Sequence, residues 1–321
     1  MTKTTPFQAV LDALLDDSQP LPQHILYQFS DIEPAQLKLL LKIWPQVSLA
    51  RQRILLDDLE ALTEEDALLY FDDLARALLD DPDAHVRAQA IRLLWESEDA
   101  KLARKFLEML NSDGAAEVRA AAATALGMFV YLGEIEEIPE AILHEIEEGL
   151  LAAVKSDKGE LVRRRALEAL GWSSRPELPD LIEAAYREKS PYWKVSALFA
   201  MGRSSGERWN KYVLSNLRSS NETIRTEAMR AAGQMSLASA APILLDMLAD
   251  EEEVDIRHEI IWSLSKIGGE DVRERFEELL NMEMDKEEAA LLEGALEELD
   301  FTDMVSGEEE FDLFDFEDDE E

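Results

Sequence analysis

Residues 113–127 read Asp-Gly-Ala-Ala-Glu-Val-Arg-Ala-Ala-Ala-Ala-Thr-Ala-Leu-Gly, and this stretch decides the fold. Apolar residues stand one position before Arg119 and three, six and seven positions after it, so they share one side of a helix with 3.6 residues per turn. The alanine at the third position allows a neighbouring helix to approach closely. Gly127, eight positions after the arginine, is expected to end the helix in the left-handed conformation.

The same box recurs along the chain. Its copies are Val86-Arg87, Val118-Arg119, Val162-Arg163, Trp193-Lys194, Ile224-Arg225 and Ile256-Arg257. The basic residues stand 32, 44, 31, 31 and 32 positions apart, and four boxes end in Gly127, Gly171, Gly202 and Gly233. Another amphipathic segment precedes each box, as in residues 178–186. One repeat is therefore two antiparallel helices that bury their apolar faces only by stacking on the next repeat. The prediction is an all-α protein, an α-α superhelix.

The pattern Asp-x-x-x-x-Val-Arg-x-x-Ala-x-x-Ala-Leu-Gly resembles the HEAT-like repeat of the phycobilisome-lyase superfamily, an armadillo-like α-solenoid. The resemblance covers about residues 63–299. We predict an N-terminal helical cap with a degenerate repeat at 1–62, a HEAT-like solenoid at 63–300 and an acidic-aromatic tail at 301–321. The resemblance implies the fold. It does not fix the function, since the same repeat serves scaffolds, lyases, a hydroxylase and DNA glycosylases.

Composition limits the classes of partner that this chain is expected to bind. The net charge is −38, which disfavours nucleic acid because a DNA binder neutralises phosphates with Lys and Arg. It favours a protein or peptide partner with a basic surface. The chain has no cysteine, no signal-like N-terminus, and no uncharged run longer than residues 120–133, which is too short to span a bilayer. We expect a cytoplasmic protein that does not bind membranes. The sequence does not determine its oligomeric state.

The basic residues of the boxes form what we call the basic ladder. Its members are Arg87, Arg119, Arg163, Lys194, Arg225 and Arg257. Six positions before each stands a residue able to cap or complement a helix N-terminus: Asp81, Asp113, Asp157, Glu188, Ser219 and Glu251. We interpret the ladder as structural, with each basic residue near an acidic residue of its own or the next repeat. A ligand-binding role is the alternative.

A second set of residues lies one and five positions after the basic residue, on the side of the helix away from the core. In related solenoids these helices line the concave surface. Five members form what we call the groove row: Val195, Phe199, Arg230, His258 and Trp262. Large apolar side chains on a wet face mark interaction sites, and aromatic and arginine anchors are typical of them. Alternatively, superhelical curvature buries Phe199 and Trp262 against neighbouring repeats.

Two further segments are unusual. The 44-residue step carries an excess near residues 128–140, which either lengthens a helix or forms a projecting binding loop. The tail at 308–321 holds ten carboxylates, no basic group, and Phe311, Leu313, Phe314 and Phe316. Such a segment cannot fold alone, so we expect it to be disordered. It either aids solubility or docks on a basic, apolar groove of a partner or on the groove row.

A hydroxylase function on this architecture would require a specific metal-binding pattern. Deoxyhypusine hydroxylase resembles this architecture and binds iron through four His-Glu pairs, and Arg257-His258-Glu259 matches that pattern locally. The chain has only four histidines, the other boxes lack the pair, and His144-Glu145 lies in a first helix. We therefore predict a non-enzymatic scaffold or adaptor without cofactor or metal. The alternatives are a superfamily enzyme handling a chromophore or metal, and an acidic regulator that imitates a polyanion.

Overall fold

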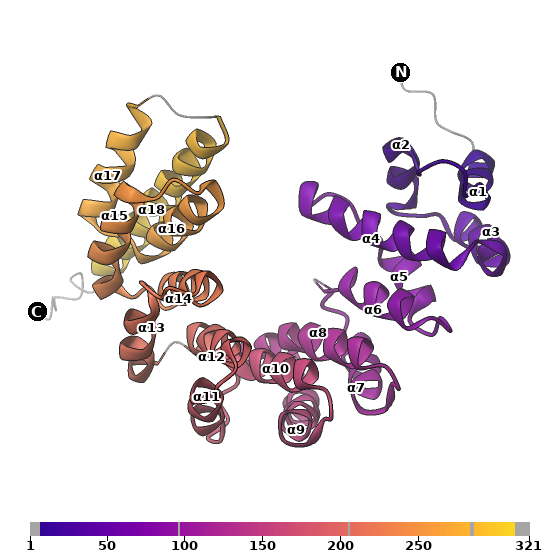
Figure 1. Ribbon diagram of the computed structural model, residues 1–321, viewed down its shortest axis with the longest axis horizontal. Helices are drawn as coiled ribbons and strands as arrows, with labels where there is room; N and C mark the ends of the chain where they lie inside the picture. Colours follow the sequence, from indigo (N-terminus) through magenta and orange to yellow (C-terminus); the bar gives the residue numbers. More distant parts are fainter. Residues whose placement is uncertain (1–6, 96, 205, 283–285, 312–321) are drawn as a thin grey trace, which may run out of the picture. The chain divides into compact units, whose positions relative to one another are not determined.

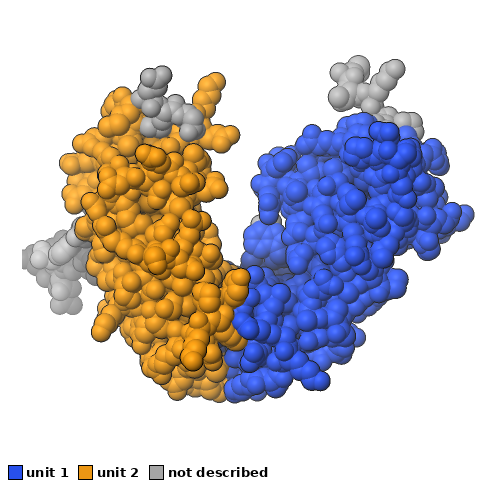
Figure 2. Space-filling view, in the orientation of Figure 1, with its two compact units in different colours: residues 1–174 blue, residues 175–321 orange. Residues whose placement is uncertain are grey.

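The computed structural model describes residues 7–95, 97–204, 206–282 and 286–311, with side chains up to residue 301 (Figure 1). The described residues are helices joined by short turns, without strands. The predicted fold class, an all-α superhelix of stacked helix pairs, is confirmed. The chain forms two compact units, residues 1–174 and 175–321, which Figure 2 colours separately. Each unit is a stack of its own.

The first unit begins with two short helices and continues with four antiparallel pairs. Its helices are α1 (Phe7–Leu15), α2 (Gln23–Leu26), α3 (Pro34–Ile43), α4 (Leu49–Glu65), α5 (Asp72–Leu78), α6 (Ala84–Arg92), α7 (Ala100–Ser112), α8 (Ala116–Glu134), α9 (Glu140–Ser156) and α10 (Glu160–Ala169). Helices α4, α6, α8 and α10 contact one another in that order, and α5, α7 and α9 cover them on one side. A 3-10 turn, η3 (Leu170–Trp172), follows α10.

The second unit repeats this plan with four more pairs. Its helices are α11 (Leu178–Tyr186), α12 (Pro191–Ser204), α13 (Asn210–Asn216), α14 (Glu222–Gln234), α15 (Ala241–Asp250), α16 (Val254–Ile267), α17 (Glu270–Leu280) and α18 (Lys286–Phe311). Here α12, α14, α16 and α18 contact one another in order, each packed against the odd-numbered helix before it. The six copies of the recurring box lie on α6, α8, α10, α12, α14 and α16.

The apolar positions of the box form the core. In α8, Val118, Ala122 and Leu126 have no exposed surface. Burying apolar area contributes about 25 cal/mol per Å², and alanine at the third position brings the even-numbered helices close together. The equivalent three positions are also buried in α14 and α16, so the apolar residues of the box form the core in each of these repeats.

The box glycines do not end their helices in the left-handed conformation, so that prediction was wrong. Among the described glycines, only Gly268 and Gly269 have a positive φ, of 72° and 110°. Gly202 and Gly233 lie inside helices, where a Cβ atom would stand 3.1 Å from the Cα of Ala231 and 2.9 Å from the Cα of Ser263. Glycine is needed here because the next even-numbered helix passes too close for a side chain.

The excess residues near 128–140 are mostly helical. They extend α8 to Glu134, and a five-residue turn connects it to the long helix α9. Phe129, Leu132 and Ile138 from this stretch are buried. The insertion therefore lengthens a helix and packs on its neighbours rather than projecting as a loop.

The N-terminal helix is packed firmly into the first unit. Val10 and Leu14 of α1 are fully buried. The buried side chain of Arg51 in α4 donates hydrogen bonds to the carbonyl oxygens of Asp16 and Gln19, each at 2.5 Å. These bonds hold the loop after α1 against the first full helix pair.

Candidate functional site

A closed set of hydrogen bonds forms at the start of the box helices α6, α8, α14 and α16. The side chain six positions before the basic residue accepts the backbone N–H two residues later, as Asp113 does from Ala115 at 2.8 Å. The arginine then turns back to the carbonyl oxygen of that same residue, as Arg119 does to Asp113 at 2.9 Å. The residue six positions back thus fixes a turn before the helix and does not cap the helix directly. Direct caps come from Asp83 in α6 and Asn221 in α14.

The basic ladder connects consecutive repeats. Arg87 donates to both carboxylate oxygens of Asp113, at 2.8 and 2.9 Å, and Arg119 does the same to Asp157. Arg257 ends the series on the buried carboxylate of Glu288, which occupies the slot where the next basic residue was due. Such two-point contacts fix the angle between repeats.

The remaining ladder residues make other contacts. Arg225 donates to the carbonyl oxygen of Ser219 at 2.9 Å, and the ammonium of Lys194 lies 5.0 Å from the ring centre of Tyr186. Arg163 occupies the equivalent place in α10 and is half-buried. The basic residues thus lie at the turns between helices, in contact with groups of their own chain.

Electrostatics agrees with this arrangement. The hydrogen bond from Arg119 holds the pKa of Asp157 below its ordinary value of 3.8, against the opposing effect of burial. Burial raises the pKa of Asp113, but the bonds from Arg87 and from the N–H of Ala115 outweigh it and lower the pKa. Both carboxylates are therefore ionised partners in the folded state.

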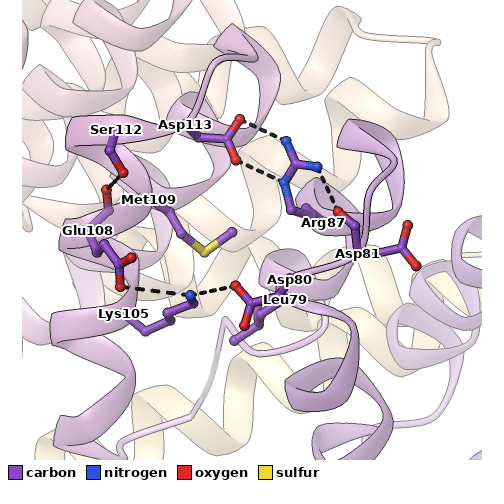
Figure 3. A pocket seen from close by; sticks show the side chains of 9 residues that line it. All are labelled: Leu79, Asp80, Asp81, Arg87, Lys105, Glu108, Met109, Ser112 and Asp113. Atoms are coloured by element: carbon purple, nitrogen blue, oxygen red, sulfur yellow. Dashed lines mark hydrogen bonds and ion pairs between the residues drawn. The ribbon is translucent and has the colours of Figure 1, made fainter. Parts of the chain in front are cut away.

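A polar hollow lies where the ladder joins α6 to α7 (Figure 3). Figure 3 shows Arg87 between Asp81 and Asp113, and Lys105 between Asp80 and Glu108. Both cations are already bonded to acceptors of the chain. The same arginine arrangement recurs at Arg119, so the hollow is a product of the repeat and neither of its cations is left for a ligand.

The groove row lies on the even-numbered helices of the second unit. Val195 and Phe199 stand on α12, Arg230 on α14, and His258 and Trp262 on α16. All five side chains are half-buried. Because α12, α14 and α16 contact one another in order, the row crosses three neighbouring helices. It is a partly open surface and not a closed core.

Cations accompany the two aromatic side chains of the row. The guanidinium of Arg203 lies 4.3 Å from the ring centre of Phe199, and the ammonium of Lys266 lies 5.8 Å from that of Trp262. In both cases the cation is four residues after the aromatic ring, one turn along the same face. Each ring therefore has a positive charge over one of its faces.

Arg230 joins the middle helix to the next. Its Nη2 donates to Glu259 Oε2 at 2.5 Å, and its Nη1 lies 3.4 Å from the buried carboxylate of Glu227. Burial lowers the pKa of Arg230, but its bonds to Glu259 and the charge of Glu227 outweigh that effect and raise the pKa. The arginine is charged and positioned on a half-exposed surface.

Two polar atoms beside this pair are buried without a hydrogen-bond partner among the described residues. They are Nε2 of His258 and Oε1 of Glu259. An unsatisfied buried polar atom costs about 1–3 kcal/mol. Both atoms are covered by the chain itself, so they do not belong to the exposed part of the groove row.

Sequence reasoning missed four side chains that complete this surface: Arg203, Glu227, Glu259 and Lys266. The four-residue spacing from Phe199 and Trp262 could have identified the two cations. The acidic residues could have been found by extending the search to the second position after each basic residue, where Glu227 and Glu259 both stand. The tail motif Phe311, Leu313, Phe314 and Phe316 lies outside the described side chains.

Within the described residues, no group of three or more His, Cys, Asp or Glu side chains is placed to hold a metal ion. His258 and Glu259 are adjacent, but Glu259 binds Arg230. None of the described helices combines the length and the hydropathy that crossing a bilayer requires.

Paired helices joined by an arginine-carboxylate ladder define a helical-repeat protein. A family model of HEAT repeats matches residues 71–142, 178–258 and 211–297, which together make up more than half of the chain. The chain therefore belongs to the HEAT repeat family. A search of curated proteins finds no match.

Solved structures of the same general architecture are similar over most of the chain. The Escherichia coli protein YibA is 18% identical, with a TM-score of 0.45, over 89% of this chain and 99% of that one. Human deoxyhypusine hydroxylase is 19% identical, with a TM-score of 0.35, over 81% and 95%. Importin beta is 14% identical, with a TM-score of 0.41, over 90% and 41%.

Proposed function

We propose that this chain is a non-enzymatic scaffold or adaptor that binds a protein or peptide on the groove row of the second unit. The observation that carries the proposal is the half-exposed set of Phe199, Arg230 and Trp262 on three adjacent helices. Aromatic and arginine anchors supply most of the energy of protein interfaces.

The charge of the chain supports a partner with a basic surface in the cytoplasm. A net charge of −38 steers basic proteins toward the chain and repels nucleic acid and anionic membranes. The absence of cysteine fits a reducing compartment.

The test is capture of partners from the source cells, followed by a binding measurement with the purified partner. The variant Phe199→Ala with Trp262→Ala is compared with Met282→Ala, an exposed apolar change between α17 and α18 of the same unit. We expect at least a 10-fold loss of affinity for the double variant and little change for the control. Retained affinity, or loss that accompanies unfolding in circular dichroism, would contradict a binding role.

Measurement of metal in the purified protein addresses the enzymatic alternative. A scaffold is expected to contain no stoichiometric iron. Iron at one or two equivalents, lost on His258→Ala, would instead favour a hydroxylase-type enzyme.

A further inference from the structure

The lengthened α8 helix of the first unit ends in an apolar surface that faces solvent. Tyr131 and Ile135 stand one helical turn apart, and their exposed fractions are 38% and 48%. Tyr131 lies in the last turn of α8 and Ile135 directly after it; we call residues 131–140, which comprise this last turn and the connection to α9, the α8–α9 corner. Most box helices in this chain end before this point, so the insertion creates the corner.

The corner is a fixed structure. Phe129 and Leu132 anchor α8 in the core, and Ile138 buries the other side of the turn. Glu136 adopts a left-handed φ of 65°, and the N–H of Glu137 closes the helix end on the carbonyl of Leu132 at 2.8 Å. The exposure of Tyr131 and Ile135 is thus set by the backbone. A rigid surface loses little entropy on binding.

A second aromatic ring and a carboxylate adjoin the corner. The ring centres of Tyr131 and Trp172 are 5.1 Å apart at an interplanar angle of 57°. Oε1 of Glu134 accepts the N–H of Ser174 at 2.6 Å, which places this carboxylate beside the end of η3. Two rings and a negative charge therefore meet at one place in the first unit.

The charged side chains of residues 131–140 are all acidic. Glu136, Glu137 and Glu140 are exposed, and no described cation lies within ion-pair distance of them. The sequence holds no Lys or Arg between Arg119 and Lys155, although seven glutamates occur there. Elsewhere the surface carboxylates commonly face a cation of the neighbouring repeat. This segment leaves them available to a partner.

We propose that the α8–α9 corner is a docking surface for an arginine-containing, partly apolar segment of a protein partner. A guanidinium stacks on the ring of Tyr131 and is held by Glu136 and Glu137, while an apolar neighbour covers Ile135. Arginine suits this surface better than lysine because its planar group stacks on aromatic faces and bonds carboxylates at two points. The surface lies in the first unit and does not depend on the groove row.

The experiment measures binding of a fluorescein-labelled peptide of Gly-Arg-Leu repeats by anisotropy, at salt near 0.15 M so that long-range attraction is screened. A peptide of Gly-Lys-Gly repeats with equal charge is the comparison. We expect the arginine-leucine peptide to bind at least about 10-fold more tightly. Equal binding of the two peptides would mean that charge alone acts, and would overturn the proposal.

Paired variants locate the binding. Tyr131→Ser with Ile135→Ser is compared with Leu68→Ser with Tyr70→Ser, which are also exposed apolar residues of the first unit. Glu136→Gln with Glu137→Gln is compared with Glu64→Gln with Glu65→Gln, an identical charge change on α4. Each corner variant is expected to weaken the peptide about 10-fold, and its control less than about twofold.

Folding and the groove row provide the remaining comparisons. The glutamine variants alter only exposed side chains, so they keep the test valid if the serine variants unfold. The Phe199→Ala with Trp262→Ala variant is expected to bind the peptide normally, because it belongs to the other surface. Equal weakening by corner and control variants, or loss only in the groove variant, would refute docking at the corner.

Discussion

Arg119 donates two hydrogen bonds to the carboxylate of Asp157, from Nε to Oδ2 at 2.8 Å and from Nη2 to Oδ1 at 3.0 Å. Its third donor, Nη1, bonds the carbonyl oxygen of Asp113 in its own repeat. The side chains of Arg119 and Asp157 are only 15% and 12% exposed. One arginine therefore fixes the turn that begins its helix and also the start of the following repeat. Removing it leaves a buried carboxylate without its partner.

The ladder predicts a stability effect. Arg119→Met keeps most of the side-chain volume but removes the two hydrogen bonds to Asp157. The largely buried carboxylate then loses its charged partner, which destabilises the folded state. We expect the free energy of unfolding to fall by about 2 kcal/mol in urea titrations followed by circular dichroism.

A surface pair supplies the control for this measurement. Arg104 lies 3.9 Å from Glu145, and their side chains are 69% and 53% exposed. Exposed pairs contribute only about 0–1 kcal/mol, so Arg104→Met is expected to change stability little. If the two variants were equally stable, the ladder would have no special structural role.

The lowered pKa of Asp157 predicts a pH dependence. In the unfolded chain this carboxyl takes up a proton near its ordinary value of 3.8, whereas in the folded chain it does so at lower pH. Its contribution is therefore complete above about pH 4 and is lost as the pH falls further. Asp157→Asn should be less stable than the natural chain at pH 7, and the difference should shrink below about pH 4.

Denaturant titrations across this range provide the measurement, at low protein concentration because the sequence pI is about 4.3. A difference between the two proteins that stays constant down to about pH 3 would show that the Arg119–Asp157 ion pair does not stabilise the fold.

The periodicity of the box was enough to predict the helix pairs, because apolar residues at fixed offsets can be buried only by stacking. The role of the glycines was not predictable in the same way. A glycine at a helix end and a glycine under a neighbouring helix look alike in sequence. Only the short distance between Gly233 and Ser263 distinguishes the second case from the first, and that distance depends on how the next helix packs.

The candidate surface was partly predictable for a similar reason. Phe199 and Trp262 each stand five positions after the basic residue of their own helix, so the sequence places them on the same face of equivalent helices. In the structure both side chains are half-buried. Contacts between helices, such as Arg230 with Glu259, depend on the register of two repeats. That register is set by the ladder and the packing of small residues, which no single-helix pattern reports.

Close approach at Gly233 predicts that a methyl group is harmful there. A Cβ atom would stand 2.9 Å from the Cα of Ser263 and 3.1 Å from the ring of Trp262, so Gly233→Ala should destabilise the second unit by about 1–3 kcal/mol. Gly294 in α18 has nothing within 4 Å. Gly294→Ala should instead stabilise by about 0.5–1 kcal/mol, since alanine favours the helix. Opposite signs in thermal unfolding test the packing; a loss at both positions would contradict it.

The groove row makes a prediction that separates binding from stability. The side chain of Arg230 is 39% exposed, but the carboxylates that it contacts, Glu227 and Glu259, are only 8% and 14% exposed. Arg230→Lys keeps a positive charge beside both carboxylates and should therefore change the free energy of unfolding by less than about 1 kcal/mol. If the planar guanidinium anchors a partner, the same variant should lose about 10-fold in affinity for the captured partner, whereas Arg218→Lys, at an exposed pair with Asp246, should not. A large fall in stability without a specific loss of affinity would make Arg230 a structural link between α14 and α16, and would transfer the search for the partner surface to the α8–α9 corner.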